Sequence, residues 1–292
     1  MPTSAERPLR IAVGQDEVEP VSSSKLQVLE EEPTRCMDVR EPTTQVTVSK
    51  IAEVTLYFWI MKVLATTLGE TTGDFISMSL GLGYYVGLGT TFALLATILV
   101  LQIANKTYQP ALFWTAIVAT TTAGTEISDF MDRSLGLGYL RGSIILFTGL
   151  IISLAVWYYR EGSLRVYPMV RRDVELMFWL AVLFSNSLGT AFGDFLVDDV
   201  GLTFLQGALV TAGVIGAVGA THYLTRVNAV VLFWIAFIFT RPFGATFGDF
   251  LTKPHAYGGL ELPRSYASLL TLALLAAALF ASRERARSQR IS

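Results

Sequence analysis

The sequence has few of the residues from which metal sites, disulfides and charged surfaces are built. One of its 292 residues is a cysteine, Cys36, and two are histidines, His222 and His255. A single thiol excludes an internal disulfide and a multi-thiolate metal site, and two histidines leave little for a zinc cluster. Charged residues make up only 16% of the chain and the formal net charge is −2, which does not fit a strongly basic nucleic-acid binder.

The motifs of several large enzyme classes are also missing. The chain has no P-loop, nucleophile elbow, His-Glu-x-x-His or Cys-x-x-Cys motif. We therefore expect neither an enzyme nor a bound cofactor. A membrane-embedded enzyme that uses paired carboxylates is a weaker alternative, because no nucleophile or metal-ligand spacing stands out.

Apolar residues, in contrast, are abundant. They make up 52% of the chain, and the mean hydropathy is +0.50. Apolar segments of about 20 residues, the length that spans a bilayer as a helix, recur along the sequence. We predict an all-α, polytopic membrane protein with eight transmembrane helices near residues 54–75, 85–104, 111–131, 140–159, 174–195, 203–223, 227–250 and 266–282.

Two polar segments flank the predicted membrane domain, residues 50–282. Residues 1–49 hold more acids than bases and no apolar run, a composition typical of a disordered tail, and residues 283–292 form a short basic tail. Eight spans place both tails on one side of the membrane. That side carries most of the lysines and arginines, which favours cytoplasmic tails (N-in, C-in) in a bacterial cytoplasmic membrane.

A fourfold internal repeat organises the membrane domain. The dipeptide Phe-Trp occurs four times, with a glycine ten residues after each tryptophan and an Asp-Phe pair whose aspartate is fifteen residues after it. Each repeat holds two helices, so the copies are parallel rather than inverted, and they cover about residues 54–105, 109–160, 174–224 and 229–282. The repeated residues are Trp59, Trp114, Trp179 and Trp234; Gly69, Gly124, Gly189 and Gly244; and Asp74, Asp129, Asp194 and Asp249.

This register resembles that of bacterial membrane proteins built from four tandem copies of a two-helix repeat marked by a tryptophan, a domain of unknown function. The resemblance covers roughly residues 50–282. It implies the repeat architecture and brings no activity, so function has to be argued from the site.

The repeated aspartates are the first candidates for such a site. Each lies about 22 Å along a helix from its tryptophan, inside the apolar core of the membrane if the tryptophans are interfacial anchors. A carboxylate there is costly and normally faces a polar interior or a partner. Glu70 and Glu126 precede Asp74 and Asp129 by about one turn and can share their helix faces. Alternatively, each aspartate marks the end of its helix and binds local backbone groups.

Two bases stand inside the predicted spans. Lys62 follows Trp59 by three residues, and we expect its amine to reach the membrane interface. Arg241 lies near mid-depth beside Pro242, a candidate for an ion pair with Glu70 or Glu126 or for an anion ligand. The equivalent residues of the other repeats, seven positions after each tryptophan, are polar too. This polar layer either lines a substrate path or only joins the helices by hydrogen bonds. They are Thr66, Thr121 and Asn186.

Our leading hypothesis is a small transporter or channel that moves a proton or divalent metal ion through an acid-lined interior. Its partners are then the lipid bilayer and a small cation, with no nucleic acid, and the sequence leaves homo-oligomerisation open. The alternative is a non-transporting scaffold or sensor that acts through the N-terminal tail. The candidate substrate-binding residues are Glu70, Asp74, Glu126, Asp129, Asp194, Asp249 and Arg241, and the candidate metal ligands are Glu70, Asp74, Glu126 and Asp129.

Overall fold

The structure is a computed structural model that describes residues 49–79 and 83–291, so most of the predicted acidic tail lies outside the described residues. In this part of the chain all regular structure is helical. Short π-helical turns extend three helices, at Phe75–Ser79, Phe130–Ser134 and Phe195–Asp199. The α-helices are α1 (Leu56–Asp74), α2 (Gly83–Ala104), α3 (Pro110–Asp129), α4 (Tyr139–Glu161), α5 (Arg172–Asp194), α6 (Phe204–Leu224), α7 (Ala229–Thr252) and α8 (Arg264–Ile291).

The helix bounds agree with the predicted spans to within two residues for the first seven helices. The eighth differs, because α8 continues as a helix through most of the predicted basic tail, residues 283–292. That segment contains alanine, arginine, glutamate and glutamine, all of which favour helix, and no glycine or proline to end it.

Six of the helices, α2 and α4–α8, are long and apolar enough to cross a membrane, as expected of an integral membrane protein. α1 and α3 are not among them, so the prediction of eight spans is supported only in part. The reason lies in their sequences: α1 carries Lys62, Glu70 and Asp74, and α3 is rich in threonine. Both helices bury most of these polar groups against protein.

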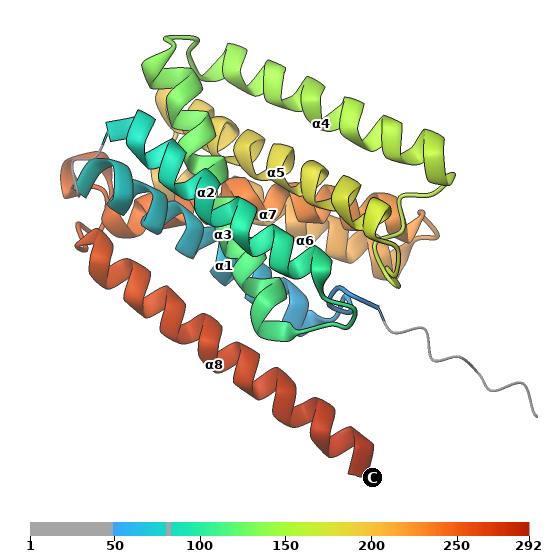
Figure 1. Cartoon of the computed structure of the whole chain (residues 1–292). Coiled ribbons are helices and arrows are strands. Elements are labelled where there is room, and N and C mark those ends of the chain that lie inside the picture. Colours follow the sequence, from blue (N-terminus) through green and yellow to red (C-terminus); the bar gives the residue numbers. More distant parts are fainter. Residues whose placement is uncertain (1–48, 80–82, 292) are drawn as a thin grey trace, which may run out of the picture. The chain divides into compact units, whose positions relative to one another are not determined.

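The first helices of the four repeats form a closed ring in the order α1, α3, α5, α7 and back to α1. The second helices pack outside this ring: α2 against α3, α4 against α5, α6 against α7, and α8 against α1 (Figure 1). Each outer helix therefore packs mainly against the inner helix of the next repeat. The four copies depend on one another, because the ring closes only where α7 of the last repeat packs against α1 of the first.

The repeated glycines allow the inner helices to approach closely. A Cβ atom on Gly69 would lie 2.0 Å from Thr121 Oγ1, and the other three glycines are similarly crowded. Each glycine meets the residue seven positions after the tryptophan of the next repeat, as expected for close helix packing through small residues. The four pairs are Gly69 with Thr121, Gly124 with Asn186, Gly189 with Arg241 and Gly244 with Thr66.

The Phe-Trp dipeptides form a second circle of contacts. The ring centroids of Phe58 and Trp114 are 5.6 Å apart, and those of Phe233 and Trp59 are 5.7 Å apart, which closes the circle. Trp114 and Trp179 are each only 1% exposed. The interpretation as interfacial anchors is therefore wrong for these two residues and for Trp234, which is 5% exposed, because they pack inside the bundle. Trp59 is only partly buried.

Candidate functional site

The predicted polar layer lies at the centre of the ring. We call it the +7 layer, after its distance from the tryptophans: Thr66, Thr121, Asn186 and Arg241. All four side chains are fully buried. Thr66 Oγ1 donates to the carbonyl of Thr240 on α7 at 3.1 Å, and Thr121 Oγ1 donates to the carbonyl of Ala65 on α1 at 3.2 Å. Part of this layer therefore joins neighbouring helices by hydrogen bonds, as the structural alternative predicted.

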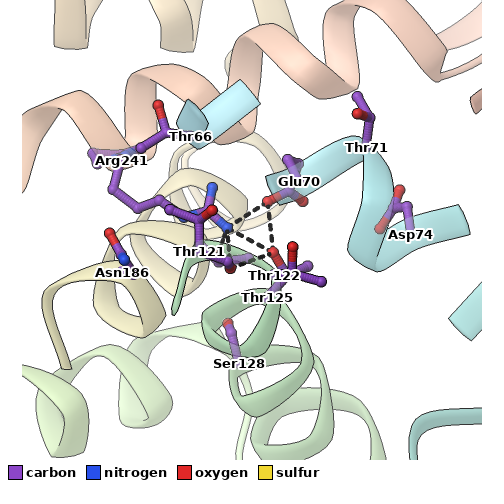
Figure 2. Close-up of polar contacts among 12 residues, drawn as sticks. Thr66, Glu70, Thr71, Asp74, Thr121, Thr122, Thr125, Ser128, Asn186 and Arg241 are labelled. Atoms are coloured by element: carbon purple, nitrogen blue, oxygen red, sulfur yellow. Dashed lines mark hydrogen bonds and ion pairs between the residues drawn. The ribbon is translucent and has the colours of Figure 1, made fainter. Parts of the chain in front are cut away.

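Arg241 is the exception, because its side chain reaches across to the other three inner helices (Figure 2). Its Nη2 atom lies 2.8 Å from Glu70 Oε2 on α1, 2.6 Å from Thr125 Oγ1 on α3 and 2.6 Å from Thr190 Oγ1 on α5. Thr125 in turn donates to Glu70 at 3.2 Å. One guanidinium thus links four helices and holds the carboxylate of Glu70, one of the two partners predicted for it.

These acceptors occupy equivalent positions eleven residues after the tryptophans. Glu70, Thr125 and Thr190 are the members from the first three repeats, and the fourth is Ala245, on the helix of Arg241 itself. Arg241 is 0% exposed and Glu70 is 3% exposed. A buried ion pair of this kind is costly to form and more costly to break, because one partner alone is an uncompensated charge.

Lys62 also points into the ring, and the expectation that it reaches the membrane interface is wrong. Its side chain is 0% exposed. Nζ lies 3.2 Å from Asn186 Oδ1 on α5 and 4.1 Å from the ring centroid of Phe237 on α7. The amine starts on an inner helix whose outer side is covered by α8, so the interior of the ring is the polar environment within its reach.

The four repeated aspartates are buried near the opposite end of the inner helices, and two bases join them in pairs. Lys253 Nζ lies 3.0 Å from Asp74 and 3.0 Å from Asp249. The same arrangement recurs with Arg133, which lies 3.4 Å from Asp129 and 4.0 Å from Asp194. Each base follows the aspartate of its own repeat by four residues and also reaches the aspartate of the next repeat in the ring.

The aspartates therefore contact side chains of neighbouring repeats. Asp129 and Asp194 make no capping hydrogen bond to the turns that follow them, so the simpler interpretation as helix-end caps is not supported for these two residues. Lys253 lies just beyond the end of α7. Burial lowers its pKa, but the attraction of Asp249 and Asp74 outweighs burial and raises the pKa well above the ordinary lysine value. The base therefore remains charged at neutral pH.

Glu126 is placed away from this network. It is 1% exposed, and its Oε1 accepts a hydrogen bond from Ser77 in the turn after α1. Its Oε2 has no hydrogen-bond partner and faces Gly87 of α2, where a Cβ atom would lie 2.7 Å away. Of the two glutamates predicted for the site, only Glu70 pairs with Arg241.

A metal centre is not formed by the predicted ligands. Among the described residues, no three His, Cys, Asp or Glu side chains are arranged to hold a metal ion. Glu70, Asp74 and Asp129 each contact a lysine or arginine instead. Because these side chains already neutralise the carboxylates, the arrangement resembles a set of internal salt bridges more than a cation cage.

The bases that pair with the aspartates were not among the candidate residues predicted from the sequence. They are Arg133, Lys253 and Arg264, whose Nε lies 3.4 Å from Asp74. A signal for two of them was available: both follow the repeated aspartate by four residues, one helical turn, and are 120 residues apart. That spacing is the one that separates the two halves of the fourfold repeat.

Comparison with known proteins bears on the repeats rather than on the chemistry. Four consecutive segments match the sequence model of one family, described as Repeat of Unknown Function (DUF347): residues 57–108, 112–163, 177–228 and 232–287. Their bounds lie within about five residues of those predicted from the Trp and Asp register. No match was found among the curated proteins or among the solved structures.

Proposed function

This chain belongs to the DUF347 repeat family, and from the geometry of its ring we propose that it moves protons across the membrane. The observation that carries the proposal is the Glu70–Arg241 ion pair, buried where all four inner helices meet. Ionisable side chains inside a membrane are expensive, and when they occur they commonly serve ion or proton movement. A bundle that needed only to hold together has no use for this pair, since the threonine and glycine contacts already join the helices.

The pair supplies a physical way to couple proton binding at Glu70 to movement of the Arg241 side chain. Glu70 either shares its charge with Arg241 or binds a proton and releases the guanidinium, and the two states favour different positions of the long arginine side chain. A proton needs no open pore, because hydroxyl and carboxylate groups can pass it along. A divalent ion needs several free oxygen ligands, and here the carboxylates are occupied by bases.

Other charged groups lie beyond Glu70 along the inner helices. From its own helix comes Asp74, from α3 Asp129, from α5 Asp194 and from α7 Asp249. The cations on the same side are Arg133, Lys253 and Arg264. We propose that the four aspartates and their shared bases form the second station of the path, at the end of the ring away from the tryptophans.

The test uses the full chain in liposomes that contain a pH-sensitive dye, with a potassium gradient and valinomycin to impose a membrane potential. Wild-type protein should acidify the lumen faster than empty liposomes, and Glu70→Gln should abolish this effect. Glu53→Gln, at an exposed acid outside the ring, should leave the rate unchanged. Uptake that persists in Glu70→Gln, or in a variant with Asp74, Asp129, Asp194 and Asp249 all replaced by asparagine, would rule the proposal out.

One observation favours the scaffold or sensor as a second candidate. The segment that follows the N-terminal tail is anchored in the bundle, because Lys50, 2% exposed, forms a buried ion pair with Glu175 of α5. Ser49, the last residue of the predicted tail, accepts a hydrogen bond from the backbone N–H of Met169 at 3.1 Å. A tail attached in this way could transmit binding of a partner to the helices. The scaffold predicts that wild-type liposomes take up protons no faster than empty ones.

A further inference from the structure

The ring contains buried hydrogen-bond donors that have no acceptor among the described residues. Lys62 has three N–H groups, and its one hydrogen-bond acceptor given by the structure is Asn186 Oδ1, at 3.2 Å. Arg241 uses Nη2 alone, while its Nε and Nη1 atoms are buried without a hydrogen-bond partner. Buried donors in proteins are nearly always paired, so unpaired ones at the centre of a bundle call for an acceptor.

Basic side chains outnumber acidic ones in the same region. Two cations, Lys62 and Arg241, lie inside the ring, and the acid that contacts them is Glu70, through its ion pair with Arg241. The repeated aspartates lie further along the helices and contact Lys253 and Arg133 instead. The middle of the ring therefore holds two basic side chains and one acidic side chain in a dry environment, where electrostatic interactions are strong.

We propose that the ring binds one small monovalent anion between Lys62 and Arg241, of the size and chemistry of chloride, nitrate or formate. Such an ion brings hydrogen-bond acceptors without donors, and its negative charge faces two basic side chains. A divalent anion would leave an excess of negative charge, and a metal ion would face two cations. The lysine side chain is long and flexible, so its amine can move from the face of Phe237 toward the ion.

Asn186 completes the site by fixing the direction of its amide. Its Nδ2 donates to Thr120 Oγ1 on α3 at 3.1 Å, which turns Oδ1 toward Lys62. Because Gly189, one turn later on the same helix, packs against the Cβ and Cγ atoms of Arg241, this face of α5 contacts both cations. Lys62 and Arg241, the two donors, are thus both held against the same face of α5.

Anion binding can be measured without any transport. The full chain in detergent is unfolded by heat in sodium gluconate and in mixtures where chloride, nitrate or formate replaces gluconate at constant sodium and ionic strength. We expect the melting temperature to rise and then saturate with the small anion. At an anion concentration a hundredfold above Kd, linkage predicts a shift of roughly a hundredfold in the unfolding equilibrium.

Variants identify the site. Lys62→Met should lose the anion-dependent shift. It should melt higher than wild type in gluconate, because it removes a buried amine that no acid contacts in the described part of the chain. Lys62→Arg should keep the shift. The control is Lys50→Met, at an equally buried lysine whose acid partner is Glu175: it is expected to lower stability in all salts and keep the shift. An equal melting temperature in all anions, or a full shift in Lys62→Met, would overturn the inference.

The experiments test the anion site and proton movement independently of each other. An anion-dependent shift in a protein that takes up no protons would remove the proposed function and leave the anion site. Proton uptake in a protein that melts alike in every anion would do the opposite.

Discussion

The ion pair between Glu70 and Arg241 makes a quantitative prediction about stability. The two atoms Glu70 Oε2 and Arg241 Nη2 are 2.8 Å apart, and their side chains are 4% and 0% exposed. Removing one partner of such a pair leaves a buried charge without compensation and costs about 3–5 kcal/mol. Arg241→Met and Glu70→Met should each lower the free energy of unfolding by about this amount.

The double variant distinguishes a specific pair from general damage. If the two losses were independent, Arg241→Met with Glu70→Met would cost about 6–10 kcal/mol, the sum of two such losses. We expect it to be no less stable than either single variant, because replacing a whole buried ion pair by apolar groups is often neutral or favourable. The released hydroxyl of Thr125 retains the carbonyl of Thr121 as its acceptor, at 3.2 Å.

The measurement is reversible unfolding in mixed micelles, with the denaturing detergent as the variable. The exposed pair of Arg171 and Glu161, 2.9 Å apart with Arg171 61% exposed, is the control cycle and should show a coupling of at most about 1 kcal/mol. Additive losses for Glu70 and Arg241 would refute the reasoning, since they would show that the guanidinium and the carboxylate do not act on one another.

Two further predictions concern packing and the isolated glutamate. Gly69→Ala should lower stability clearly more than Gly213→Ala, because a Cβ at Gly69 meets Thr121 Oγ1 at 2.0 Å while the space at Gly213 is open. Melting temperatures of the two variants compare the losses directly. Equal losses would contradict the close approach of the helices at Gly69. Glu126→Gln should leave stability unchanged or raise it, because Glu126 pairs with Ser77 rather than with a base; a loss as large as that of Glu70→Met would show a missed partner.

Hydropathy and spacing were sufficient to predict the helices and the repeat. Apolar segments of about 20 residues located the first seven helices to within two residues. The spacing of the Phe-Trp and Asp-Phe dipeptides predicted four equivalent units. These features are local or periodic, so they can be read from one chain. The extension of α8 was missed because charge ends a hydrophobic segment without ending a helix.

Which residues face the interior was harder to predict. The sequence places Lys62 near one end of a span, and an isolated helix would send its amine to the interface. The ring reverses this outcome, because α8 covers α1 on the outside and Asn186 offers an acceptor within. The tryptophans were misinterpreted for the same reason. Whether a side chain faces lipid, a neighbour or the centre depends on the closure of the ring, which no single repeat encodes.

The arrangement also explains why the charges differ between copies while the packing residues do not. Glycine, Phe-Trp and aspartate recur because every interface of the ring needs them. At the centre, four symmetric copies of one long side chain would compete for the same space, and four arginines would repel one another. One copy therefore supplies Arg241 and another supplies Glu70, where the equivalent residues half a ring away are Thr121 and Thr190.

The fourfold symmetry of the ring predicts that the pair can be moved to the other half of the ring. The variant Arg241→Thr, Glu70→Thr, Thr121→Arg and Thr190→Glu shifts both charges by 120 residues, and Gly69 then faces the new arginine as Gly189 faces Arg241 now. It should fold with a stability close to that of the wild type. The variant with Arg241→Thr, Glu70→Thr and Thr190→Glu, which moves the carboxylate and leaves it without an arginine, should lose about 3–5 kcal/mol. Equal instability of both variants in the micelle unfolding assay would show that the two halves are not interchangeable, and that the identity of the outer helices, not the ring symmetry, determines where the charges lie.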